Sequence, residues 1–204
     1  WMHWLYLSNY SLGYGYSRHK LLHVAWSLSI EEQFYLLWPL IVYVFPRRKL
    51  AFICAGIVLL SPFMRAFFIE VVGSSAKLVS YSTHLHMDGL ALGGLIWIVY
   101  ENNNFAISRR MRRSAWTALP FLFLGLVGVW LWQETHSMRD GRYLGQAPGV
   151  IAYGLSIVIL FFGAILIVCL PNDANVTAPR LTTHRAAIWL GKYSYAAYLL
   201  HEPV

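Results

Sequence analysis

The sequence predicts an all-α protein, a polytopic bundle of transmembrane helices with about six visible spans. Of its 204 residues, 58% are hydrophobic and only 12% are charged, about half the charged fraction of an ordinary soluble domain. The mean hydropathy is +0.51, and the apolar residues fall in runs long enough to cross a bilayer. Aromatic residues make up 16% of the chain, which suits anchoring at the lipid–water interface.

Taken in order, the chain begins with a polar segment and continues as apolar runs. Residues 1–25 mix Tyr, Ser, Gly, Asn and His without a sustained apolar run, so we expect an extracytoplasmic loop there. Residues 26–204 are expected to form a partial transmembrane domain, the interior of a longer protein. Its expected spans are 27–45, 50–69, 82–100, 115–133, 148–170 and 186–202.

The basic residues predict which side of the membrane each loop faces. The net charge is +7, and its densest clusters, Arg47–Lys49 and Arg109–Arg113, fall in loops on the same side. Under the positive-inside rule this side is cytoplasmic. Because this rule explains the basic clusters, we expect no nucleic-acid partner. The segment 1–25 and the outer ends of the first three spans then face away from the cytoplasm.

Two adjacent carboxylates, Glu31 and Glu32, lie at the mouth of the first apolar span. A carboxylate in hydrocarbon costs about 2.5–3.5 kcal/mol, so such a residue is a functional candidate, as general acid or base or as the group that orients one. Ser29 and Glu32 have capping-box spacing. Spacing therefore favours Glu31 for chemistry and Glu32 for architecture, and a polar cap at the membrane surface is the plain alternative.

A second polar group opens the third span. His84, His86 and Asp88 form a His-x-His-x-Asp segment, in which His84 and Asp88 would meet on one helical face. Only these two share a face and no third ligand is evident, so we expect no metal. An interfacial polar cap is an equal alternative to a His–carboxylate pair.

Two further spans carry polar residues near their outer ends. Arg65 needs either a counter-charge among the acidic residues named above or a route for its side chain to the interface. In the last span, Ser194, Tyr198 and His201 share one face. His23 precedes the glutamates and is by default a loop residue.

Three stretches together resemble the motifs of the membrane-bound acyltransferase family 3. Residues 23–39 read HVAWSLSIEEQFYLLWP, residues 87–94 read MDGLALGG, and residues 190–204 read LGKYSYAAYLLHEPV. Their order and spacing match that family across nearly the whole chain. The sequence departs from the family at His86, where Arg is more common, and a neutral imidazole does not replace a permanent guanidinium.

The resemblance implies an integral enzyme of a bacterial-type cytoplasmic (inner) membrane. Such an enzyme moves an acyl group, often acetyl, from cytoplasmic acyl-CoA to a hydroxyl of an extracytoplasmic carbohydrate or cell-surface glycan, with no bound cofactor. By resemblance, Glu31 and Glu32 are the catalytic candidates. The substrate-binding candidates are His23, Trp26, Ser27, Arg65, His86, Asp88, Tyr198 and His201.

Part of the family's catalytic machinery is not found in this sequence, and a second function is also possible for its intramembrane charges. The family histidine and its upstream arginine have no counterpart here, so we expect them before residue 1 and expect the 204 residues alone to be inactive. A transporter or flippase for a polar or glycan-linked substrate is the alternative, because charges inside a membrane also mark substrate pathways. It predicts paired, interrupted helices in two halves, which the sequence does not show.

Overall fold

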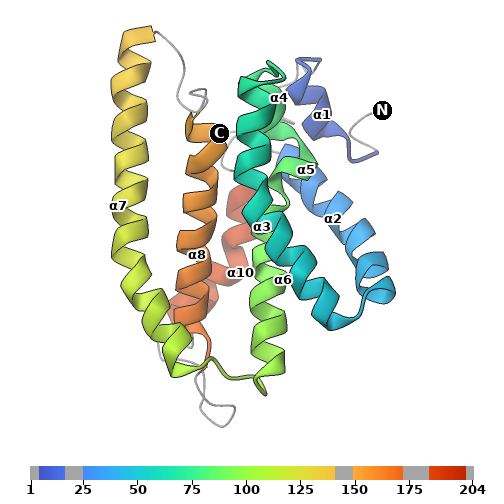
Figure 1. The fold of residues 1–204 in the computed structure, drawn as a ribbon, viewed down its shortest axis with the longest axis vertical. Coiled ribbons are helices and arrows are strands. Elements are labelled where there is room, and N and C mark those ends of the chain that lie inside the picture. The colour runs from blue at the N-terminus through green and yellow to red at the C-terminus, as the bar shows by residue number, and fades with distance from the viewer. Residues whose placement is uncertain (1–4, 17–24, 141–148, 172–183, 201–204) are drawn as a thin grey trace.

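A computed structural model describes residues 5–16, 25–140, 149–171 and 184–200 of the chain (Figure 1). Every regular element in these ranges is helical, which confirms the all-α class. In chain order the elements are α1 (Ser8–Gly13), α2 (Ala25–Val44), α3 (Arg47–Glu70), α4 (Ala76–Tyr81), α5 (Thr83–His86), α6 (Asp88–Asn102), α7 (Arg109–Asp140), the π-helix η2 (Val150–Gly154), α8 (Leu155–Cys169) and α10 (Arg185–Leu200).

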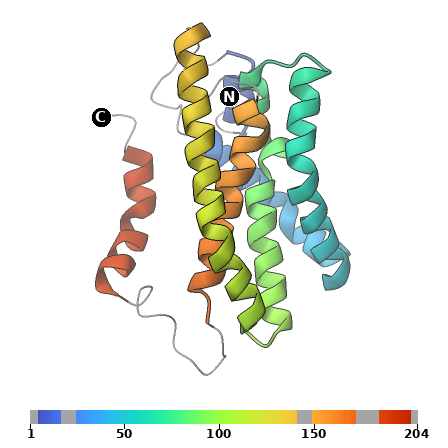
Figure 2. The same cartoon turned by 60° about the vertical axis from the view of Figure 1, so that its left-hand side comes forward.

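The long helices α3, α6, α7 and α8 run side by side, with α7 against α8 and α3 against α6 (Figure 1). The short helices α1, α4 and α5 gather at one end of this bundle, beside the start of α2. Helix α10 stands apart from the others when the molecule is turned (Figure 2). The ends of several helices are thereby brought together at the end that holds the short helices.

Three helical segments are long and apolar enough to cross a membrane: Arg47–Glu70, Arg109–Thr135 and Val150–Cys169. The first has 24 residues and is about 36 Å long at 1.5 Å per residue, more than the hydrocarbon core requires. These segments identify a membrane protein. Helix α6 has 15 residues and is about 22 Å long, so its crossing, like that of α2 and α10, stays a prediction.

The observed elements differ from the expected spans in three places. The segment 82–100 is not one helix, because α5 ends at His86 and α6 begins at Asp88. The span 115–133 extends in both directions into α7. The segment 1–25 contains helix α1, in which Asn9 and Leu12 are buried, so this part of the chain is packed rather than a plain loop.

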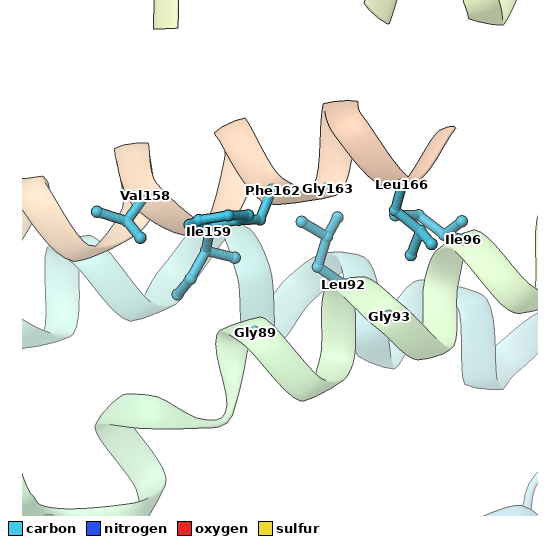
Figure 3. A pocket seen from close by; sticks show the side chains of 9 residues that line it. All are labelled: Gly89, Leu92, Gly93, Ile96, Val158, Ile159, Phe162, Gly163 and Leu166. Atoms are coloured by element: carbon cyan, nitrogen blue, oxygen red, sulfur yellow. The ribbon is translucent and has the colours of Figure 1, made fainter. Parts of the chain in front are cut away.

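An apolar groove runs between α6 and α8 (Figure 3). Its volume is about 250 Å³, and it is lined by Gly89, Leu92, Gly93, Ile96, Val158, Ile159, Phe162, Gly163 and Leu166. None of the polar candidates lines it. The groove is therefore a packing feature of two apolar helices that approach closely at glycines.

Gly94 brings α6 against the core residues of α2 and α3. A Cβ atom there would lie 3.2 Å from the Trp38 ring and 3.7 Å from Cys54 Sγ, whereas a Cβ at Gly93 meets no described atom within 4 Å. We expect Gly94→Val to lower the free energy of unfolding by about 1–3 kcal/mol through overpacking. Gly93→Val is the matched control and should change it far less. Thermal unfolding in detergent micelles measures both, and equal losses would contradict this packing.

Candidate functional site

Arg65 lies near the end of α3 and its side chain is fully buried, with 0% exposure. Its Nη2 donates to Asp88 Oδ2 at 2.9 Å and to Ser156 Oγ at 2.5 Å. Its Nη1 donates to Leu85 O at 2.6 Å, and its Nε donates to Ala152 O at 3.1 Å. We call these five residues the Arg65 cluster. It joins α3 to α5, α6, η2 and α8.

The cluster decides between the two expectations for Arg65. The counter-charge is Asp88, itself 1% exposed, and a side chain reaching to the interface is excluded by the burial of the guanidinium. Four of the five guanidinium N–H groups are already engaged. The geometry therefore makes Arg65 a structural residue, and its expected contact with substrate stays untested.

Arg65 and Asp88 also explain why the expected span 82–100 is broken. In a continuous helix the N–H of Gly89 would donate to the carbonyl of Leu85. Instead, that carbonyl accepts from Arg65 Nη1, and Gly89 N donates to Asp88 Oδ1 at 3.2 Å. The side chains of one ion pair thus replace a backbone hydrogen bond, and α6 starts afresh at Asp88.

The π-helix η2 is the third unusual feature around Arg65. Single π-turns are rare and are frequent at functional sites, and here the carbonyl of Ala152 accepts from Arg65. Ser156, which follows at the start of α8, was not among the sequence candidates. The sequence feature that could have identified it is that Ser156 is the only serine or threonine in the apolar run from Val150 to Cys169.

A small cavity adjoins the Arg65 cluster on the α3–α8 side. Its volume is about 190 Å³, and Asp88 and Ser156 line it together with apolar residues that include Pro62 and Phe63. Phe63 is 66% exposed, so this side of the bundle faces the surroundings of the helices. The polar pair inside the protein is therefore close to an apolar surface.

Trp26, Tyr81 and His86 form an aromatic cluster at the same end of the bundle. The Trp26 ring lies 5.1 Å from Tyr81 and 5.9 Å from His86, both in edge-to-face geometry. The Nδ1 atom of His86 is buried and has no hydrogen-bond partner. The structure thus brings together His86 and Trp26, two of the substrate-binding candidates, and their predicted roles are not tested by it.

The expected pairing of His84 with Asp88 is wrong. The break between α5 and α6 separates their faces, the Asp88 carboxylate is held by Arg65 and Gly89 N, and His84 is exposed with its ring 5.9 Å from Phe68. In the part of the chain that the structure describes, no group of three or more His, Cys, Asp or Glu residues could hold a metal ion.

A buried amide and hydroxyl network fixes α1 to the site, and the sequence did not predict it. Asn9 Nδ2 donates to Tyr81 O and to Thr83 Oγ1, each at 2.9 Å. Thr83 Oγ1 donates to Gln33 Oε1 at 2.6 Å, and Gln33 Nε2 donates to Asn9 Oδ1 at 3.2 Å. The network holds α1, α2 and α5 together just beside Trp26 and His86.

The predicted capping box of Ser29 and Glu32 is wrong. Helix α2 begins at Ala25, so Ser29 lies inside the second turn. Its side chain is buried, and its hydroxyl hydrogen-bonds that of Ser8 on α1. The Ser29 hydroxyl thus bonds to α1 and does not cap α2. The spacing of residues in the sequence does not reveal such a tertiary contact.

Glu31 and Glu32 are both partly exposed on α2. No hydrogen bond or ion pair joins either carboxylate to another described residue, and neither contacts Arg65. Along the helix Glu31 is about 60° and Glu32 about 160° from the buried Phe34. Glu32 in turn is about 60° from the buried Ser29, so each glutamate borders the packed face of α2 and the assignment of the chemistry to Glu31 stays a prediction.

The remaining candidates are only partly described. Ser27 lies in the first turn of α2 and has a polar interaction. Tyr198 belongs to α10, but its side chain lies outside the described residues, as do His23 and His201 altogether. Their predicted roles are not tested by the structure.

Comparison with known proteins adds an independent observation. Over 186 residues, 88% of its length, the chain is 27% identical to a Bacillus subtilis protein provisionally named a peptidoglycan O-acetyltransferase. The chain resembles O-acetyltransferases. The likeness recurs at 25% identity over 189 residues in a Staphylococcus aureus protein provisionally named an O-acetyltransferase. It recurs at 25% over 200 residues in a provisionally named acetyltransferase of Acidianus two-tailed virus.

The chain covers only part of the length of each of these relatives. The chain spans 27% of the Bacillus protein, 29% of the Staphylococcus protein and 52% of the viral protein. No known family profile matches the chain, and no solved structure matches it. The likeness is thus to parts of proteins named O-acetyltransferases, while membership in family 3 remains an expectation from the motifs.

Proposed function

We propose that this protein acts as a membrane O-acetyltransferase of a bacterial-type cytoplasmic membrane. It would move an acetyl group from cytoplasmic acyl-CoA to a hydroxyl of an extracytoplasmic carbohydrate or cell-surface glycan. The observation that carries the proposal is the likeness to relatives named O-acetyltransferases over 88% of the chain. The polar clusters at one end of an apolar helix bundle support it, because such groups are costly in a membrane without a function.

The proposed reaction is the exchange of a thioester for an ester. The hydroxyl oxygen of the acceptor forms a bond to the acyl carbon, and the carbon–sulfur bond of the donor breaks. The hydroxyl proton passes to a base, and the thiolate of coenzyme A leaves. Catalysis then requires a base, donors that stabilise the oxyanion, and exclusion of water from the thioester.

We assign three tasks of that reaction to this chain's own residues. Glu31 accepts the hydroxyl proton or orients the base that does so. The imidazole of His86 hydrogen-bonds the acceptor, and the rings of Trp26 and Tyr81 give the sugar an aromatic face. The Arg65 cluster holds the segment of His86 in place, since its contacts fall on the residues to either side of that histidine.

O-acetyl esters on surface glycans test this function in cells. Cells that express the protein should carry more base-labile acetate on their surface glycans than matched cells without it, as measured by acetate release under mild alkali. The effect should disappear in the Glu31→Gln variant at equal expression. An unchanged acetyl content, with glycan exported only when the protein is present, would instead favour the transporter.

A further inference from the structure

The end of the bundle opposite the short helices is strongly basic. Helices α3 and α7 begin there, at Arg47 and Arg109, and α6 and α8 end there (Figure 1). Contacts hold these termini together, since Arg47 Nη2 lies 2.9 Å from Glu101 Oε1 and Ile107 N donates to Pro171 O at 2.8 Å. We call this region the basic end.

Two of its bases have partners within the protein. Arg47 pairs with Glu101, and Arg112 Nη2 donates to the carbonyl of Leu170 just after α8. Within the described ranges Glu101 is the only acidic residue at this end. The other bases are exposed and have no acidic partner among the described residues: Arg48, Lys49, Arg109, Arg110 and Arg113.

The positions of these bases are electrostatically unfavourable in the protein alone. Arg109 and Arg113 are four residues apart on α7, where like charges destabilise a helix. The first turns of α3 and α7 also carry the positive ends of the helix dipoles, which disfavour bases there. An anion placed against the basic end would relieve both effects.

Exposed aromatic residues lie beside the same bases. Trp97, Tyr100 and Phe105 contact one another with ring centroids 5.7–6.0 Å apart, and Trp97 is 54% exposed. Trp116, three residues after Arg113, is 59% exposed. Tryptophan and tyrosine gather at the level of lipid headgroups, so the bases reach the depth of the phosphates.

We propose that the basic end binds anionic phospholipids, with headgroup phosphates against Arg109, Arg110 and Arg113 on α7 and against Arg48 and Lys49 on α3. The aromatic residues mark the boundary with the acyl chains. A lipid fits better than a small soluble anion, because the bases stand in two groups at the starts of separate helices rather than around one pocket. This inference does not depend on the proposed enzymatic activity.

Lipid binding to the detergent-solubilised protein, measured by native mass spectrometry, tests the proposal. We expect phosphatidylglycerol to bind in preference to phosphatidylcholine. The triple variant Arg109→Gln, Arg110→Gln, Arg113→Gln should bind phosphatidylglycerol at least about tenfold more weakly, since each base near an anionic surface contributes to the attraction. Circular dichroism of the variant checks that its helix content is kept.

Two controls separate charge from position. The triple variant with Lys at the same three positions keeps the charge and should retain most of the binding. Lys77→Gln removes an exposed base of α4 at the other end and should leave it unchanged. Equal binding of the two lipids, wild-type binding by the triple Gln variant, or displacement of the lipid by millimolar inorganic phosphate or coenzyme A would each overturn the proposal.

Discussion

Replacing Arg65 with alanine is expected to lower the free energy of unfolding by about 3–5 kcal/mol, because it leaves the Asp88 carboxylate buried without its counter-charge. The carbonyls of Leu85 and Ala152 would lose their donor at the same time. Unmet polar groups of this kind are costly in a low-dielectric interior. Unfolding in detergent micelles, followed by circular dichroism, measures the loss.

Arg47→Ala is the matched control, since it removes an arginine from an ion pair of the same 2.9 Å length. The Arg47 side chain is 70% exposed, and exposed pairs contribute about 0–1 kcal/mol. The difference between the two variants isolates the effect of burial. Losses of equal size would show that the Arg65 cluster does not support the fold in the way its contacts indicate.

The Glu31→Gln variant is expected to lose acyl transfer by about 10²–10⁴-fold, the usual contribution of general acid–base catalysis. Glutamine keeps the size and polarity of the side chain but cannot take up a proton. Glu32→Gln should stay within a few-fold of the wild type, because the proton transfer is assigned to Glu31 alone. Initial rates at matched expression compare the two variants.

Three outcomes of that comparison are informative. Loss in Glu31→Gln alone supports the assignment. Loss in Glu32→Gln alone transfers the role to the neighbouring carboxylate and contradicts the assignment of Glu31. Wild-type rates in both variants would show that neither carboxylate takes part in the chemistry.

Much of the fold was predictable because it depends on composition and local periodicity. The low charge and the long apolar runs predicted a helical membrane protein, and three of the expected spans coincide with helices long enough to cross a bilayer. The same logic listed Asp88 among the partners of Arg65, since a charge within an apolar span needs an opposite charge nearby.

The site could be predicted only in part, because its decisive contacts join distant segments. Nothing near Asn9 in the sequence indicates that it meets Thr83, and nothing near Ser156 indicates a bond to Arg65. The break before α6 arises when two side chains take over a backbone hydrogen bond. Helical periodicity treats each segment alone and therefore predicted one continuous helix.

Transfer of labelled acetyl groups by the purified protein tests the proposed function most directly. The protein would be reconstituted in lipid vesicles with radiolabelled acetyl-CoA on one side of the membrane and a cell-wall glycan on the other. We predict label in the glycan as a base-labile ester, present with the wild type and absent with Glu31→Gln. Release of free labelled acetate only, or passage of unmodified glycan across the membrane, would contradict an O-acetyltransferase.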